Sequence, residues 1–326
     1  MNVAYLDMAR GLDVAALISL GVLGLLGLIV GSLVKVKNNT TGQDEQSGLG
    51  GVEALVLVVV GGFLARTFIW LLLLPLNDVK SGAVVLGHFF FLIPAVIDDF
   101  IAIGGPRVLT SPEGLLFLAT VIGAFTAMMD GVWRIHDWKG LGWLSFPLDM
   151  TWGLAGVNYG LLLHLVNFAW ANHATETRHN GHRYQSGFRL KPTFAFTQGS
   201  VMSNLSDNPG TDLYRHEMTH VWQNRMFGPF YTLNYIGWMI FWLIPGLIAG
   251  ATSKTATGAS VGPGKGAERW CYFNCPWEVW GYAVQGQDRK AWGSELIWSA
   301  VPVIIAAIFV FGGITALCIV LYGLQL

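Results

Sequence analysis

The chain has few charged residues and few cysteines, and each shortage argues against a class of protein. Only 12% of its 326 residues are charged, against roughly a quarter in soluble domains, which argues against an ordinary water-soluble protein. Three cysteines make no disulfide framework, and a net charge of −1 gives no reason to expect a nucleic-acid partner. The sequence also has no internal repeat and no low-complexity tract.

Apolar residues, glycine and tryptophan are abundant instead. Hydrophobic residues make up 53% of the chain, with 41 glycines and 14 tryptophans, as is typical of membrane helices and their interfacial belts. We therefore predict a mainly α-helical, multi-pass protein of the lipid bilayer. Apolar runs near the length that crosses a bilayer occupy residues 14–34, 52–75, 83–103, 114–130, 150–171 and 297–323.

The first apolar run is expected to be a signal anchor that stays in the protein. The residues before it include Asp7, Arg10 and Asp13, where a cleaved signal peptide would carry a basic cluster. The run is also long and is followed by Lys35 and Lys37.

One short motif carries chemistry. Residues 216–220 read His-Glu-Met-Thr-His, the pattern H-E-x-x-H. Residues four apart share a helix face, so His216 and His220 can bind one metal ion. Glu217 would then stand beside the metal, where a carboxylate can take a proton from a metal-bound water.

A catalytic zinc needs a third protein ligand, and Glu278 is the main candidate. It follows Pro276, which suits the first turn of a helix because its missing N–H would have no partner there. Glu278 would therefore lie in the opening turn of a second helix. Other residues remain open as third ligands: Glu268, Asp288, Glu295, and the pair Cys271 and Cys275.

The order H-E-x-x-H, spacer, helix-borne Glu resembles the gluzincin branch of zinc metallopeptidases, and Asn274-Cys275-Pro276-Trp277-Glu278 is similar to their N-x-P-x-E pattern. The resemblance implies that His216, His220 and Glu278 bind zinc and that Glu217 is the general base. Some gluzincins carry an Asp four residues after the glutamate to orient a histidine. Here that position is Tyr282, so the groups that orient the ligands must differ.

Two local patterns precede the proposed zinc helix. Residues 189–197 alternate, Gln198-Gly199 signals a turn and residues 200–205 follow, which predicts a β-hairpin. In zincins such a strand commonly pairs with substrate, so this one is either a substrate-binding edge or a structural ribbon. Thr211 or Asp212 is expected to cap the helix.

The apolar run 229–250 lies between the two halves of the proposed site. A single crossing would put Glu278 and His216 on opposite sides of the membrane, where they could not share a metal. We therefore expect this segment to be re-entrant, with a break at Pro245-Gly246. Prenyl-protein and stress-linked membrane metallopeptidases, which the architecture broadly resembles, also separate their zinc and glutamate helices with a membrane hairpin. The resemblance covers roughly Pro192 to Gln287.

Three parts are predicted: a transmembrane bundle of about five spans at 1–172, a zincin-like metal-site region at 173–296, and a C-terminal transmembrane helix at 297–326. The basic residues predict the side of the site, because cytoplasmic loops carry more Lys and Arg. Most Lys and Arg residues fall on the side of the site. Those expected on the other side are Arg10, Lys80, Arg134 and Lys139, so the site is predicted to face the cytoplasm.

Several polar residues fall within or between the apolar runs. Arg66 is expected to pair with Asp98, Asp99 or Asp130, because an unpaired charge in a membrane is costly. His88 and His164 are expected to be buried and hydrogen-bonded. The histidines of the polar loop, His173, His179 and His182, are expected to be solvated and not to form a second metal site.

These patterns predict a membrane-integrated zinc metallopeptidase that hydrolyses a peptide or membrane-protein substrate near the membrane surface. Tyr282 or Tyr231 could stabilise the oxyanion, and the spacing selects neither. Two alternatives remain: a zinc hydrolase acting on a lipid-linked amide or ester, and a membrane sensor or scaffold that binds zinc without catalysis. An intact Glu217 favours catalysis, because a structural zinc needs no base beside it.

Overall fold

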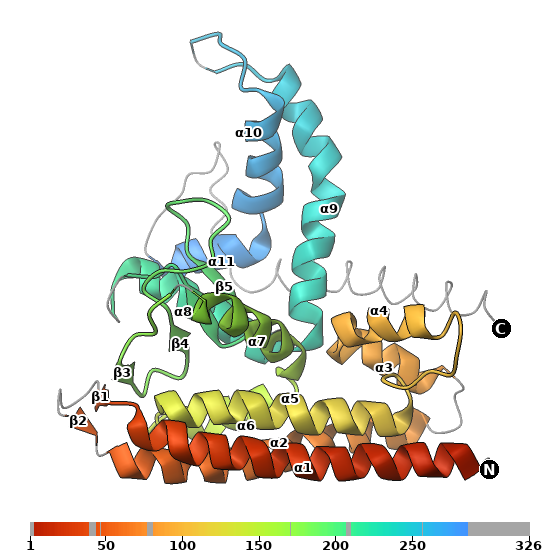
Figure 1. Ribbon diagram of the computed structural model, residues 1–326. Helices are drawn as coiled ribbons and strands as arrows, with labels where there is room; N and C mark the ends of the chain where they lie inside the picture. Colours follow the sequence, from red (N-terminus) through yellow and green to blue (C-terminus); the bar gives the residue numbers. More distant parts are fainter. Residues whose placement is uncertain are drawn as a thin grey trace. The chain divides into compact units, whose positions relative to one another are not determined.

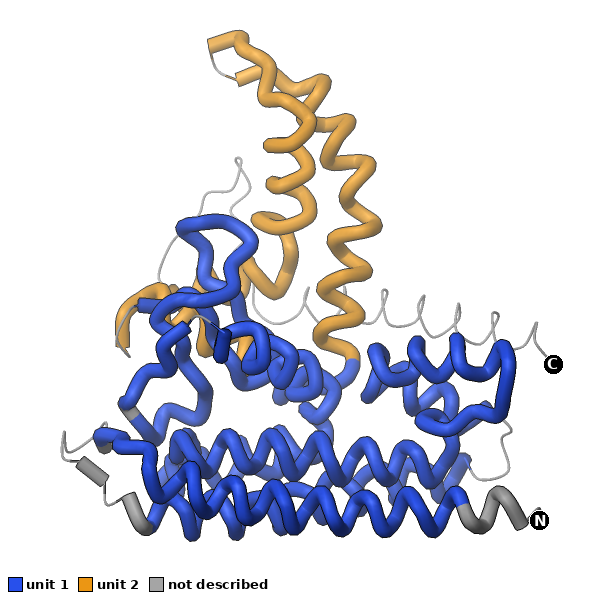
Figure 2. The backbone as a smooth tube through the Cα atoms, in the orientation of Figure 1, with its two compact units in different colours: residues 1–206, 224–229 blue, residues 207–223, 230–326 orange. Residues whose placement is uncertain are grey.

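The computed structural model describes residues 3–38, 44–45, 47–76, 81–169, 171–206, 210–255 and 257–285. The protein is mainly helical (Figure 1), as predicted. The chain forms two compact units (Figure 2). Unit 1 comprises residues 1–206 and 224–229, and unit 2 comprises residues 207–223 and 230–326. The three-part division expected from the sequence stays a prediction, and its last part, 297–326, lies outside the described residues.

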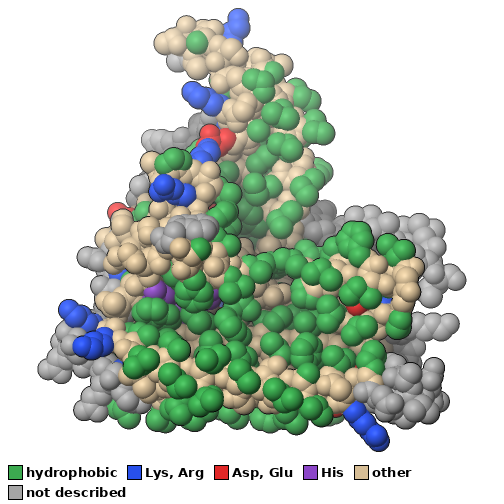
Figure 3. Space-filling view, viewed as in Figure 1, with side chains coloured by type: hydrophobic (Ala, Val, Ile, Leu, Met, Phe, Trp, Pro, Cys, Tyr) green, Lys and Arg blue, Asp and Glu red, His purple; other side chains and the backbone are tan. Residues whose placement is uncertain are grey.

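Three long helices form the base of unit 1: α1 (Val3–Leu33), α2 (Ser47–Leu73, continued by the 3₁₀ turn η1, Leu74–Leu76) and α5 (Pro112–Trp133). They lie side by side (Figure 1). Small side chains allow this close approach, since Ala54, Ala65, Ala124 and Ala127 are all fully buried. The outer faces of α1 and α2 expose large apolar side chains such as Leu17 and Phe63. Figure 3 shows apolar side chains covering much of this side of the molecule, as expected of helices that face lipid.

Four helices in the described ranges are long and apolar enough to cross a membrane: Met8–Leu33, Leu49–Leu76, Pro112–Trp133 and Pro229–Thr252. The prediction of a multi-pass helical protein is therefore confirmed in its general form. The expected run 297–323 lies outside the described residues.

Two of the expected spans are wrong. Residues 83–103 form two short helices, α3 (Gly82–Phe90) and α4 (Leu92–Ile101), which are separated at Phe91. Pro94 has no N–H to donate to the carbonyl of Phe90, so a continuous helix is interrupted here. In the described part of 150–171, the helix after the end of α6 (Gly142–Met150) is α7 (Leu154–Phe168). Its 15 residues extend about 22 Å, too little to cross the hydrocarbon core.

Short strands complete unit 1, together with α6 (Gly142–Met150). Strands β5 (Phe196–Gln198) and β6 (Val201–Ser203) pair antiparallel, which confirms the predicted hairpin. Gly199 at its turn has a φ of 59°, the left-handed conformation that glycine adopts without cost. Strand β4 (His182–Arg183) adds parallel to β6. A second small sheet joins β1 (Val36–Asn38) to β2 (Asp44–Glu45) and β3 (Glu176–Thr177).

The partner expected for Arg66 is also wrong. Arg66 Nη2 lies 2.7 Å from Asp13 Oδ1, so two neighbouring membrane helices supply both charges. Asp98 instead accepts hydrogen bonds from the backbone of residues 108–110 and from the Thr110 hydroxyl, and Asp99 pairs with Arg107 and His88. His164 is buried and hydrogen-bonded to the Tyr184 hydroxyl, as predicted. His88 is hydrogen-bonded to Asp99, as predicted, but is only partly buried.

Unit 2 is built on a helical hairpin. Helix α9 (Pro229–Thr252) is followed by α10 (Pro263–Glu268), the π-helical turn η2 (Arg269–Phe273) and α11 (Pro276–Val284). The return limb packs closely on α9, since a Cβ at Gly250 would lie 2.8 Å from the Cα of Gly266. The Trp238 indole also donates to the carbonyl of Trp270 at 3.2 Å. Figure 1 shows α9 and α10 side by side.

The break expected at Pro245-Gly246 is not present. Helix α9 runs through Pro245 to Thr252, because one proline removes a single backbone hydrogen bond, which an apolar helix tolerates. The chain reverses instead between residues 253 and 262, where Val261 N donates to Ser253 O at 3.0 Å. The re-entrant insertion of this hairpin into a membrane stays a prediction.

Candidate metal centre

The H-E-x-x-H motif lies on helix α8 (Asp212–Phe227), as predicted. Thr211 precedes the helix, and its hydroxyl accepts a hydrogen bond from Tyr214 N at 3.3 Å, so Thr211 is the N-cap. His216, Glu217 and His220 are all at least 95% buried. The helix therefore presents both imidazoles to the interior of unit 2.

The predicted third ligand reaches the same point from helix α11. Pro276 occupies the first turn, with Cys275 as the N-cap residue, and Glu278 follows in that turn. Glu278 Oε2 lies 3.2 Å from His216 Nε2, and Glu278 Oε1 lies 3.3 Å from His220 Nε2. The two imidazole Nε2 atoms are 3.1 Å apart. The hairpin thus brings Glu278 to the same site as His216, which the sequence argument required.

The spacing of these atoms fits zinc. Nitrogen and oxygen ligands lie about 2.0–2.1 Å from a tetrahedral zinc, so any two of them are about 3.3 Å apart. The three distances here are 3.1, 3.2 and 3.3 Å. Three protein ligands would leave the fourth tetrahedral position for water or substrate, as in catalytic zinc sites.

The hydrogen-bond roles also point to a cation. Gln223 Nε2 donates to the carbonyl of Trp277 at 3.0 Å, so Gln223 Oε1 faces His220 Nδ1 at 2.8 Å. His220 Nδ1 must therefore carry the proton, which leaves a lone pair on Nε2 of the neutral imidazole. That lone pair faces a second imidazole nitrogen and a carboxylate. A bound cation or an added proton between these atoms would pair with the lone pairs that they direct at one another.

The charged groups within the site also favour a positive charge there. Burial alone would lower the pKa of His220, but Glu278 and Glu217 outweigh burial and raise this pKa to about 9. Burial alone would raise the pKa of Glu278, but His220 and His216 hold it well below its usual range. The site therefore favours positive charge at the point where His216, His220 and Glu278 meet.

No protein-family model, curated protein or solved structure matches this chain. The assignment of the site therefore depends on its own geometry. Among the described residues, His216, His220 and Glu278 form a buried group whose ligand atoms could hold one metal ion.

The other described residues considered as third ligands are not part of this group. Burial, followed by the charge of Glu278, raises the pKa of the Cys275 thiol, and burial also raises that of Cys271. Cys271 donates instead to the carbonyl of Met239 at 3.3 Å. Glu268 is not in the group, and Asp288 and Glu295 lie outside the described residues.

Aromatic and amide side chains that the motifs did not identify surround the three candidate ligands. Tyr235 donates to Glu278 Oε1 at 2.7 Å. Tyr231 OH lies 3.3 Å from His220 Nδ1. The Tyr282 ring packs against the His216 ring, with 4.5 Å between the ring centroids. The sequence signal that could have found Tyr235 is its i, i+4 spacing from Tyr231 at the start of α9.

His216 is positioned by packing. Its Nδ1 has no hydrogen-bond partner among the described residues. A Cβ at Gly281 would lie 2.8 Å from Cε1 and 2.9 Å from Nδ1 of the same ring. Only glycine at this position of α11 allows the helix to approach the imidazole so closely.

We expect Gly281→Ala to weaken zinc binding by about 10- to 100-fold, the size typical of losing the orientation of a ligand, because the added methyl group would displace His216. Competition with a chromogenic chelator measures the affinity. The matched control is Gly264→Ala, since a Cβ at Gly264 meets no atom within 4 Å. Equal zinc affinity of Gly281→Ala and wild type would contradict this account of His216.

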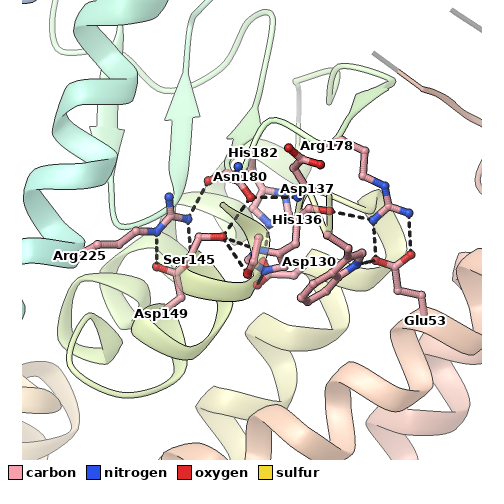
Figure 4. A network of polar contacts seen from close by, with 12 residues as sticks. Glu53, Asp130, His136, Asp137, Ser145, Asp149, Arg178, Asn180, His182 and Arg225 are labelled. Carbon is pink, nitrogen blue, oxygen red and sulfur yellow. Dashed lines mark hydrogen bonds and ion pairs between the residues drawn. The ribbon is translucent and has the colours of Figure 1, made fainter. Parts of the chain in front are cut away.

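A second buried polar cluster lies in unit 1 (Figure 4). Asp130 accepts from His136 Nε2 at 2.8 Å and from His182 Nε2 at 2.9 Å. The His173 and His182 rings are hydrogen-bonded at 2.9 Å, and His182 is fully buried. The expectation of a solvated histidine loop is therefore wrong here, because the loop folds inward and His182 pairs with a carboxylate of α5.

Asp130, His136 and Asp149 also have ligand atoms close enough to hold a metal, but their other contacts argue against one. Arg225 bonds both oxygens of Asp149, at 2.9 and 2.7 Å, and both side chains are fully buried. A divalent cation beside Asp149 would be repelled by this guanidinium. The cluster is better explained as a network that holds the last turn of α8 in unit 1.

Proposed function

We propose that the protein is a membrane-integrated zinc metallopeptidase with His216, His220 and Glu278 as the zinc ligands. The observation that carries the proposal is the convergence of three buried ligand atoms at 3.1–3.3 Å, with Glu217 buried next to His216 on the same helix. A structural zinc would need no carboxylate at that position.

Each side chain has a role in this proposal. When bound, zinc polarises a scissile carbonyl and acidifies water. Glu217 takes a proton from the attacking water and passes it to the leaving amine. The oxyanion role stays open between Tyr231 and Tyr282, because the Tyr231 hydroxyl lies 3.3 Å from His220 Nδ1, the ring atom on the side away from Nε2. The predicted role of the β5–β6 hairpin as a substrate edge stays a prediction.

The position of the site supports a substrate at the membrane surface. Helix α9 is a candidate membrane span that begins at Pro229. Tyr231 and Tyr235, which contact His220 and Glu278, lie within about 9 Å of its start. The proposed substrate is therefore a peptide segment of a membrane or membrane-bound protein. The distribution of Lys and Arg favours the cytoplasmic side.

Peptide cleavage by detergent-purified protein tests the proposal. We expect the protein to cleave members of a peptide library presented in liposomes, to lose this activity on treatment with a zinc chelator, and to regain it when zinc is restored. Cleavage that persists after zinc is removed would contradict the proposal. Hydrolysis confined to lipid-linked amides or esters would favour that enzyme class. Firm zinc binding without any hydrolysis would favour a sensor or scaffold.

A further inference from the structure

Gln223 joins the two helices that carry the proposed ligands. It lies on α8 three residues after His220, and it is fully buried. Its amide oxygen lies 2.8 Å from His220 Nδ1, and its amide nitrogen donates to the carbonyl of Trp277 at 3.0 Å. Trp277 directly precedes Glu278 on α11. One amide group therefore contacts one ligand and the residue next to another.

The amide has only one satisfactory orientation. The Trp277 carbonyl can only accept a hydrogen bond, so the amide nitrogen must face it and the amide oxygen must face His220. His220 Nδ1 must then donate, which places the lone pair of the imidazole on Nε2. That atom faces His216 Nε2 and Glu278. The amide thus selects the tautomer of His220 that can bind a metal.

We propose that Gln223 is the positioning residue of this metal centre: it fixes the tautomer and ring orientation of His220 and, through Trp277, holds α11 so that Glu278 meets the histidines. This inference depends on the proposed metal site. In many zinc sites a carboxylate or a carbonyl orients the ligating histidine. Here a neutral amide orients His220, while Tyr282, at the position where some gluzincins carry an orienting Asp, packs against the ring of His216.

Two variants of Gln223 separate positioning from packing. Gln223→Met keeps the length of the side chain but cannot accept from His220. Gln223→Glu keeps an acceptor for His220 and loses the hydrogen bond to the carbonyl of Trp277. We expect the zinc dissociation constant of Gln223→Met to rise by about 10- to 100-fold. The fold increase for Gln223→Glu should be at least about three times smaller than that for Gln223→Met. Thr219→Ala on the same helix, which removes a methyl group and a hydroxyl bonded to the carbonyl of Arg215, should bind zinc like wild type.

The zinc-induced increase in melting temperature is the second measurement, because Gln223→Met could also lower stability without zinc. A positioning role predicts that Gln223→Met reduces this increase relative to wild type, whatever its melting temperature without zinc. An unchanged increase, an affinity within twofold of wild type, or equal losses in the Met and Glu variants would overturn the inference. If wild type itself binds no zinc, the proposed metal site fails, and the role of Gln223 fails with it.

Discussion

Replacing Glu217 by Gln is expected to reduce peptide hydrolysis by at least about 10²- to 10⁴-fold, the usual contribution of a general base, while leaving one zinc bound per chain. The amide has nearly the shape of the carboxylate but cannot accept a proton from water. Glu217 is buried and is not among the three side chains whose ligand atoms meet. Its replacement should therefore affect the reaction and not the binding of the metal.

Initial rates of wild type and Glu217→Gln on the same liposome-presented peptides measure the loss, and elemental analysis of the same samples measures zinc. Glu113→Gln, on helix α5 of unit 1, is a matched control that should keep wild-type rates. Equal rates for wild type and Glu217→Gln would show that Glu217 is not the base. Loss of zinc from Glu217→Gln would show instead that this carboxylate helps to hold the metal.

Replacing Asp149 by Asn is expected to lower the free energy of unfolding by about 3–5 kcal/mol, because it leaves the guanidinium of Arg225 buried without a counter-charge. Both side chains of this pair are fully buried, and Arg225 also donates to the carbonyl of Asn180 at 2.7 Å. Denaturant unfolding in detergent micelles gives the difference between variant and wild type.

Two control variants show whether the loss of stability in Asp149→Asn comes from the buried ion pair. Arg215→Gln removes an exposed partner of Asp212, 3.5 Å away, and should change stability by less than about 1 kcal/mol. The double variant Asp149→Leu with Arg225→Met should recover much of the loss, since it removes both buried charges. A single variant as stable as wild type would mean that this pair does not anchor the end of α8.

The features predicted correctly from the sequence are local ones. Helix α8 with the H-E-x-x-H motif, its cap at Thr211 and the start of α11 at Pro276 each depend on a few consecutive residues with a defined backbone preference. The β5–β6 hairpin likewise follows from alternation and a Gly turn. The approach of Glu278 to His216 and His220 could be predicted because a site of this type requires a third ligand and the helix-borne carboxylate has the right order along the chain; its role as a ligand stays a prediction.

The features missed depend on contacts between distant segments. The sequence offers several carboxylates as partners for Arg66, and only the packing of α1 on α2 selects Asp13. Gln223 and Tyr235 belong to no motif, and their roles appear only when α8, α9 and α11 come together. Pro245 shows the opposite error: a residue that disrupts helices locally does not end α9, whose apolar neighbours keep the helix formed.

The zinc content of purified protein tests the central claim most directly. We expect one zinc per chain in wild type and in His88→Ala, whose imidazole is hydrogen-bonded to Asp99 in unit 1. We expect the zinc content of His216→Ala and of Glu278→Ala to fall well below one zinc per chain, since each variant loses one of the three proposed ligands. Stoichiometric zinc in purified His216→Ala would contradict the claim that His216, His220 and Glu278 form the metal centre.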